Sequence, residues 1–301
     1  MRKLLLLLLI AAGQFVYAQR IDVRSIQLLK GTEQGGYFHP VFSPQATYLL
    51  TTAENYAGLN RHALTANKIE TLTTDAGAGY GARISSDEST ILFNRTEMRN
   101  NLRYSSLQSY SLTGKKQVKL ADATREKVSP LFAGNVPAFI KGKTLTKINK
   151  TAEKVSPYIN IEDRKMVLYA GDTRKVLAPN GDNKSYFWAS VSPDGKHIVY
   201  TVAACGSFVC DINGANAVSL GKLNAPKWLN NQWVIGMNDQ DNGDHVTASE
   251  IVAATIDGKT RQALDAPFVK IAMYPSASAD GKQIAFNTDK GQIYIMNIEL
   301  K

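Results

Sequence analysis

Aromatic side chains recur at one position of this sequence, just before the first strand of a repeated strand–turn–strand unit. The set comprises Tyr37, Tyr80, Tyr158, Tyr186 and Tyr274, with His39, Trp188 and Trp228 close by in the same phase. Aromatic faces that carry polar groups suit sugars, peptides or extended polymers, because they combine stacking area with hydrogen bonds. The alternative is that these rings pack between neighbouring sheets as core. The eight residues are therefore candidate ligand-binding residues.

The densest polar cluster is the segment 238–245, which contains Asp239, Asp241 and Asp244. Carboxylate and amide oxygens are the hard ligands that calcium prefers. The spacing does not reproduce the EF-hand loop, since the fifth residue counted from Asp239 is Gly243 and no glutamate follows in register. A solvated hairpin loop explains the composition better, so no cofactor is expected, and calcium or another divalent metal is the alternative.

The only cysteines are Cys205 and Cys210. Zinc normally takes four ligands, and no second pair exists to complete such a site. If residues 206–209 form a four-residue loop, the two cysteines face each other across a hairpin, and an oxidising compartment would permit a disulfide. Two small buried thiols on neighbouring strand faces are the alternative.

Catalytic signatures are weak. The four histidines, His39, His62, His197 and His245, are dispersed. The sequence has no G-x-S-x-G segment of the kind that exposes a hydrolase nucleophile. No pair of carboxylates can be assigned to glycoside hydrolysis from sequence. These features favour a binding protein over an enzyme.

The element that must position these residues is best seen at residues 189–200, where a short strand leads through Ser-Pro-Asp-Gly into the apolar triplet Ile198-Val199-Tyr200. Proline, aspartate and glycine are the residues that a tight turn requires, and β-branched and aromatic residues suit the strand that follows. A similar hairpin recurs, giving about seven copies in all, at residues 42–50, 84–93, 132–140, 159–169, 191–200, 228–235 and 277–286.

Further short strands follow the hairpins. Third strands are expected at 207–212, 251–256 and 292–298, and fourth strands at 68–72, 217–220 and 260–264. A repeat of about 40 residues with four strands per unit is typical of a β-propeller blade. The chain ends in a third strand, and residues 25–29 form a stray fourth strand, so the two termini are expected to share one blade and thereby cover exposed strand edges. The count favours seven blades, with six as the alternative, and the compact units near Phe132 and Ile161 are expected to be three-stranded or partly merged.

The N-terminus reads as a targeting segment. Basic Arg2 and Lys3 precede an apolar run, and Val16 and Ala18 supply small residues at the −3 and −1 positions of a cleavage site. That layout predicts a signal peptide at residues 1–18 and a mature propeller domain at 19–301, exported to the periplasm or secreted. The residue directly after the expected cleavage point is not a cysteine, so a lipoprotein is not expected. The apolar run is also too short to span a bilayer.

Charge and composition exclude one class of partner. The formal charge of +9 falls to +7 when Arg2 and Lys3 are removed. The basic residues are scattered rather than gathered on a helix or arginine-rich tract, so nucleic acid is not an expected partner. The chain is expected to be a monomer.

The repeat resembles that of the TolB-like propeller family. Val191–Tyr200 and Ala277–Phe286 match the family's Ser-Pro-Asp-Gly hairpin well, Phe42–Leu50 and Ile84–Phe93 match moderately, and the remaining units match in outline. The resemblance covers the whole mature chain and implies a propeller, while that fold hosts many activities. TolB's additional N-terminal α/β domain has no counterpart here, so a role in the Tol system is not expected.

The resemblance implies two functions. The first is a non-catalytic scaffold that recognises a protein segment or a cell-envelope polymer, such as a peptidoglycan-associated partner, at the mouth of the propeller channel. The second is a metal-assisted polysaccharide lyase or hydrolase, because some TolB-like propellers are similar to oligogalacturonate lyases, which gather histidines around a metal. Only His39 is placed to point into the channel, since His197 lies past the turn of its hairpin.

Overall fold

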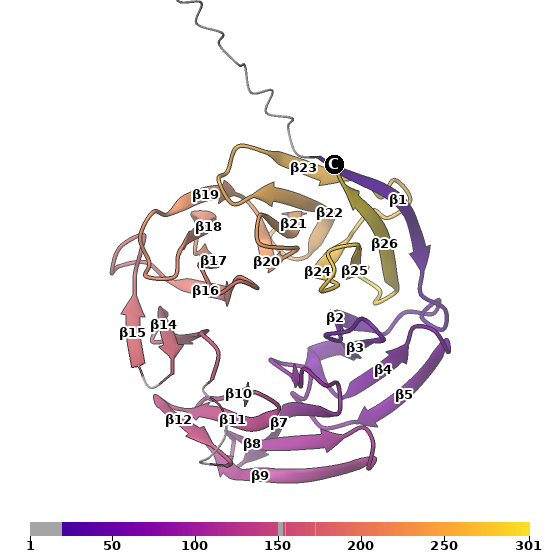
Figure 1. Ribbon diagram of the computed structural model, residues 1–301. Coiled ribbons are helices and arrows are strands. Elements are labelled where there is room, and N and C mark those ends of the chain that lie inside the picture. Colours follow the sequence, from indigo (N-terminus) through magenta and orange to yellow (C-terminus); the bar gives the residue numbers. More distant parts are fainter. Residues whose placement is uncertain (1–19, 150–152, 154, 172) are drawn as a thin grey trace, which may run out of the picture.

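The computed structural model describes residues 20–149, 153, 155–171 and 173–301. Within them the chain forms seven antiparallel sheets, arranged around a common centre as blades (Figure 1). The one helical element in this part of the chain is a 3-10 turn, η1 (Glu54–Tyr56), and none of the described helices could cross a membrane. The protein is therefore an all-β propeller of seven blades, not six. The expected signal peptide lies outside the described residues.

Each blade runs outward from the ring centre in chain order. Blade 1 contains β2 (Phe38–Phe42), β3 (Tyr48–Thr52), β4 (Leu59–Ala63) and β5 (Lys68–Thr73). Blade 2 contains β6 (Arg83–Ile84), β7 (Thr90–Arg99), β8 (Leu102–Ser111) and β9 (Lys116–Thr124). Blade 5 contains β16 (Tyr186–Val191), β17 (His197–Val202), β18 (Gly206–Asp211) and β19 (Val218–Gly221). Blade 6 contains β20 (Asn224–Trp228), β21 (Trp233–Asp241), β22 (Val246–Thr255) and β23 (Arg261–Leu264).

Two consecutive blades have three strands each among the described residues, in agreement with the expectation of three-stranded or partly merged units. Blade 3 contains β10 (Val128–Ala133), β11 (Val136–Lys141) and β12 (Thr144–Lys147). Blade 4 contains β13 (Tyr158–Glu162), β14 (Lys165–Ala170) and β15 (Thr173–Leu177).

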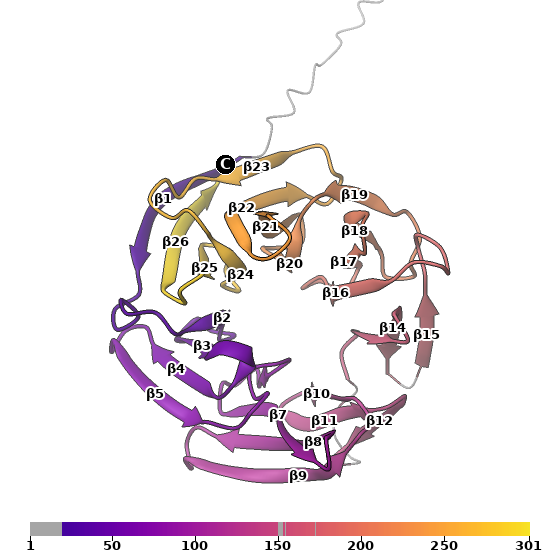
Figure 2. The same cartoon turned by 180° about the vertical axis from the view of Figure 1, so that it is seen from behind.

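Blade 7 closes the ring with both ends of the chain. It contains β24 (Met273–Ala277), β25 (Gln283–Asn287) and β26 (Ile293–Leu300), with β1 (Ile21–Leu28) as its outermost strand. The two terminal strands pair antiparallel, from Ile21 opposite Leu300 to Leu28 opposite Tyr294, and the view from behind shows β1 along the outer side of β26 (Figure 2). The prediction of a shared blade is confirmed, with β1 beginning earlier than the expected residues 25–29.

The repeated turn is held by one serine. Ser192 accepts hydrogen bonds at its Oγ from the backbone N–H of Lys196 (3.2 Å) and His197 (2.9 Å) and donates to Asp194 (2.6 Å). The bond from Ser192 holds the pKa of Asp194 below its usual value, and the backbone N–H of Lys196, which also donates to Asp194 at 3.1 Å, acts in the same direction. Gly195 then adopts a left-handed backbone with φ of 74°. In the copies at residues 42–50 and 84–93, which lack this glycine, the same place is left-handed too, with φ of 53° at Ala46 and 58° at Glu88.

The core consists of seven apolar clusters among the described residues, one between each pair of neighbouring blades. The apolar triplet of blade 5 illustrates how it forms. Ile198 and Tyr200 pack against blade 4, whereas Val199 packs against blade 6. Successive strand residues point to opposite faces, and both faces of a blade are covered. The second strands are therefore continuously apolar rather than alternating.

Candidate functional site

The innermost strands share a bulge that positions the candidate site. Pairing with the second strand shifts register in β2, β16, β20 and β24. At each shift one residue has a left-handed backbone: His39 (φ 51°), Trp188 (52°), Ala225 (49°) and Tyr274 (52°). Gly81 (71°) occupies the corresponding place before β6. Such a bulge redirects a side chain and interrupts pairing, and left-handed non-glycine residues are costly and cluster at functional sites.

Three of the predicted residues meet at this end of the ring, together with one that the sequence pattern did not identify. His39 stacks on Tyr56, with ring centroids 4.3 Å apart, and its other neighbour is Tyr274 at 4.1 Å. Tyr56 also contacts the edge of Tyr80 at 5.2 Å. We call His39, Tyr56, Tyr80 and Tyr274 the mouth cluster. It joins the bulges of blades 1 and 7 to two loops, one within blade 1 and one leading into blade 2.

A cavity of about 400 Å³ lies beside the mouth cluster. Blades 1, 6 and 7 form its walls, and the residues that line it are Phe38, His39, Glu54, Asn55, His245, Val246, Met273, Tyr274, Asn287 and Asp289. The backbone N–H of His39 donates to Oδ1 of Asn287 at 3.0 Å, which holds the bulge against blade 7. Tyr80 remains 55% exposed, so the cluster presents an aromatic surface next to the cavity.

Burial keeps three residues of the mouth cluster, His39, Tyr56 and Tyr274, uncharged at neutral pH, and a nearby charge contributes at His39. The pKa of His39 falls to about 4, chiefly because burial disfavours the imidazolium and also because Lys227 is cationic. Burial raises the pKa of the Tyr56 and Tyr274 hydroxyls. A neutral imidazole between two phenol rings can stack and hydrogen-bond.

Four other candidates pack between blades instead. Tyr37 lies edge-on against His62 at 4.8 Å and contacts the cluster between blades 7 and 1. Tyr158 packs between blades 3 and 4. Tyr186 is 2% exposed, and its hydroxyl bonds the backbone of Asn180 and Gly181. Trp228 donates its indole N–H to the carbonyl of Ser190 at 3.2 Å.

Trp188 stands apart from both groups. It is 42% exposed at the bulge of blade 5 and contacts Phe187 edge-to-face at 4.8 Å.

The sequence pattern did not predict Tyr56, because this residue follows the second strand of its blade rather than preceding the first. Its only sequence signal is the segment Glu54-Asn55-Tyr56, whose last two residues are left-handed.

The aspartate-rich segment forms a hairpin end rather than a cage. Asp239 lies within β21 and accepts a hydrogen bond from Asn224 at 2.7 Å. Asp241 and Asp244 are exposed, and the turn is stabilised by Asn242, which accepts from the N–H groups of Asp244 and His245. Among the described residues, no three histidine, cysteine, aspartate or glutamate side chains come together in a way that could hold a metal ion.

The four-residue loop on which a disulfide would depend does not form, whereas the third strand expected at residues 207–212 does. Residues 206–211 form β18, so Cys205 is exposed in the turn before the strand and Cys210 is buried near its far end. A strand rises about 3.3 Å per residue, which separates the two by more than a disulfide can bridge. Both thiols are free, and burial raises the pKa of Cys210 to about 12.

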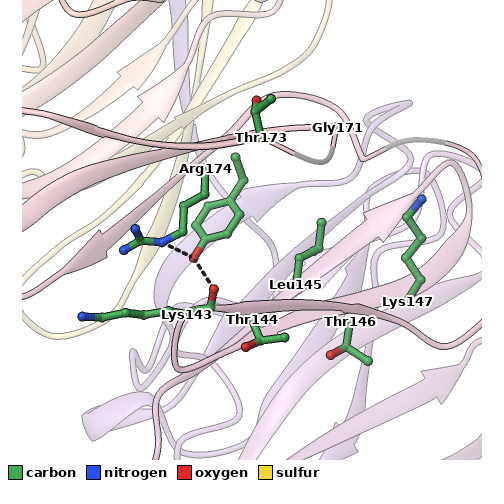
Figure 3. A pocket seen from close by; sticks show the side chains of 9 residues that line it. Lys143, Thr144, Leu145, Thr146, Lys147, Gly171, Thr173 and Arg174 are labelled. Carbon is green, nitrogen blue, oxygen red and sulfur yellow. Dashed lines mark hydrogen bonds between the residues drawn. The ribbon is translucent and has the colours of Figure 1, made fainter.

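A larger cavity, about 580 Å³, lies at the outer rim between the two three-stranded blades. Its walls are β12 and the start of β15, with Arg174 standing over the strand that carries Lys143 and Lys147 (Figure 3). Arg174 pairs with buried Glu162, and Tyr169 donates to the same carboxylate at 2.6 Å. These three residues all belong to blade 4, so their bonds stabilise that blade. Lys143 pairs with Asp163 at 3.1 Å, and this ion pair links blade 3 to blade 4.

Comparison with known proteins identifies the fold. No family model matches the sequence, and no curated protein matches it either. Among solved structures, oligogalacturonate lyase from Vibrio parahaemolyticus superposes with a TM-score of 0.58 at 13% identity, covering 93% of this chain and 96% of the lyase. A second oligogalacturonate lyase, in complex with manganese, gives 0.51 at 15% identity, over 88% of this chain and 78% of the other.

TolB from Acinetobacter baumannii is also similar, with a TM-score of 0.51 at 16% identity over 77% of this chain. The match covers 54% of the TolB chain, about half its length. At these identities the likeness concerns the fold alone. The chain is thus a seven-bladed β-propeller whose solved relatives in shape include both TolB and oligogalacturonate lyases.

Proposed function

We propose that this protein is an exported, non-catalytic binding scaffold that holds a segment of another protein or a cell-envelope polymer at the mouth cluster. The observation that carries the proposal is the set of four contacting rings beside a cavity of about 400 Å³. A side chain or sugar that docks there gains aromatic contact from rings already fixed by their neighbours, so little side-chain entropy is lost on binding.

The chemistry of the cluster favours binding over reaction. A neutral His39 packed between Tyr56 and Tyr274 offers surface area and hydrogen bonds. The strained backbone at His39 and Tyr274 aims both rings at the same place. Exposed Tyr80 extends that surface toward solvent, and aromatic residues in such positions dominate binding energy at many interfaces.

A metal-assisted lyase is the second candidate. It is favoured by the likeness to oligogalacturonate lyases, one of them described in complex with manganese, and by two histidines, His39 and His245, that line one cavity. The donor set of the described residues does not fit such an ion, because the ring neighbours of His39 are tyrosines and no three ligating side chains come together. We therefore route no chemistry through a metal.

The test is capture of partners from envelope extract and binding to isolated peptidoglycan sacculi, with the wild-type chain and three variants. Tyr80→Ala and Tyr274→Ala should each weaken binding about tenfold or more, since losing an aromatic anchor costs roughly 1–2 kcal/mol or above. Tyr104→Ala is the matched control, because Tyr104 lies on β8 beneath Arg99, outside the mouth cluster.

Two results would refute the scaffold. One is equal binding by Tyr80→Ala, Tyr104→Ala and the wild type. The other is turnover of oligogalacturonate that depends on added manganese and disappears in His39→Ala, which would establish the lyase instead. Metal content of the purified protein, measured alongside, separates a bound ion from an added one.

A further inference from the structure

Two cations approach the centre of the ring from innermost strands. The position two residues after the bulge is occupied in five blades by Val41, Arg83, Ser190, Lys227 and Ser276. Only Arg83 and Lys227 are charged, and both are basic and solvent-exposed. They belong to blades 2 and 6, which lie three blades apart in a ring of seven. The two side chains therefore start from nearly opposite sides of the centre.

Contacts confirm that Arg83 reaches inward. Its guanidinium carbon lies 5.3 Å from the ring centroid of Tyr158, on β13 of blade 4. Blade 3 lies between blades 2 and 4, so Arg83 crosses the inner side of blade 3 to make this contact. Cation–π contacts of this length are favourable but leave the guanidinium N–H groups available.

The two positive charges act on each other. Desolvation by the surrounding strands, together with the smaller effect of repulsion from Arg83, lowers the pKa of Lys227 to about 8. The charge of Lys227 also contributes to the low pKa of His39 on blade 1. Three innermost strands thus share one electrostatic environment.

No acid among the described residues compensates this pair. Neither Arg83 nor Lys227 has a hydrogen bond or ion pair with a described carboxylate. Lys127 of blade 3 provides the contrast, since its ammonium donates to Asn160 at 2.9 Å and to the carbonyl of Ile161 at 2.8 Å, with Glu162 nearby. Like charges held together in a confined space are unfavourable until an anion joins them.

We propose that Arg83 and Lys227 form an oxyanion-binding site at the centre of the ring, which accepts a carboxylate or phosphate group. Arginine offers a planar fork of donors and lysine a compact ammonium, and together they suit an oxyanion that enters between them. Anion binding at this site can be tested separately from partner binding at the mouth cluster, because the site needs no partner protein or polymer to be occupied.

The test uses the full mature chain with inorganic phosphate and, separately, acetate, in calorimetric titration at low ionic strength and in thermal unfolding. The wild type should bind and gain thermal stability. Lys227→Gln and Arg83→Gln should each weaken binding about tenfold or more, while Lys68→Gln, an exposed lysine on the outer strand of blade 1, should bind as the wild type does. Tighter binding of phosphate than of acetate would assign the site to phosphate groups, and the reverse to carboxylates.

Two further readouts separate binding from misfolding. Without added anion, Lys227→Gln should unfold at the same temperature as the wild type or higher, because it removes a repulsion. Anion affinity should decline as pH rises through about 8, where Lys227 loses its proton. Absence of binding by both anions, or equal binding by the wild type and Lys227→Gln, would overturn the site.

Discussion

Ring closure can be weakened at its first residue. Ile21 begins β1, is 1% exposed, and belongs to the cluster between blades 6 and 7 with Leu264 and Ile298. Its backbone is held on both sides by Gln262, which accepts from the Ile21 N–H at 3.0 Å and donates to its carbonyl at 2.6 Å. The position is thus fixed even when the side chain is shortened, so Ile21→Ala should leave an unfilled cavity.

The loss can be worked from the carbons removed. Ile21→Ala deletes three carbons, each contributing about 0.8 kcal/mol when buried, or roughly 2.4 kcal/mol of transfer free energy. A cavity that cannot collapse adds to this, and large-to-small core substitutions of this kind cost about 2–5 kcal/mol. We expect the free energy of unfolding to fall by about 3–4 kcal/mol.

The assay is equilibrium urea unfolding, followed by far-ultraviolet circular dichroism and by tryptophan fluorescence. Val118→Ala on β9 is the control, because Val118 is 44% exposed and surface substitutions usually change stability by less than about 0.5 kcal/mol. A loss below about 1 kcal/mol for Ile21→Ala, with an unchanged denaturant slope, would contradict the docking of β1 in blade 7.

Three further outcomes are expected. Without denaturant, a thiol reagent should modify Cys205 and leave Cys210, whose pKa burial raises to about 12, unreacted until the chain unfolds; rapid modification of both would contradict the strand between them. Burial lowers the pKa of His62 from 6.5 to about 4. As pH falls below 6.5 the unfolded chain therefore takes up the proton before the folded chain does, and the contribution of His62 to stability, complete above pH 6.5, is lost as pH approaches 4. This acid-dependent loss should shrink in His62→Gln, and an identical pH profile would refute it. Gln262→Leu should lower the midpoint of thermal unfolding, because the Ile21 N–H and carbonyl lose their partners at a cost of roughly 1–3 kcal/mol; an unchanged midpoint would show that water replaces both bonds.

The blade hairpins were predictable because one local device builds them. Ser192 and Asp194 bond the backbone of their own turn, so the signal lies within a few residues. The apolar second strands were equally readable, since both faces of each blade are buried and residues such as Val199 and Tyr200 are apolar on either side. The sharing of one blade by the two chain termini was predictable because the chain ends in a third strand and begins with an unpaired fourth strand.

The functional site was only partly predictable, because aromatic residues in one sequence phase meet different neighbours. Tyr186 is the first residue of β16 and Tyr274 the second residue of β24, yet Tyr186 packs against Tyr200 while Tyr274 contacts His39 on the next blade. The bulge that redirects His39 and Tyr274 involves proline at the next residue in both strands. Proline has no backbone N–H to donate and is confined within sheets to edges and bulges, so the proline after His39 and after Tyr274 is the sequence signal of the bulge.

The pairing of β1 with β26 has a consequence for synthesis. Contacts such as that between Arg24 and Glu299 join residues 275 positions apart, so β1 is made first and has no partner strand until nearly the whole chain has emerged from the ribosome. Earlier blades can form their hairpins as they are synthesised, but the propeller ring stays open. The apolar faces of the blades on either side of the opening then remain exposed to solvent. Completion is then a single late event that must bring two distant segments together, and a nascent chain stalled before residue 293 would expose those faces to chaperones and proteases.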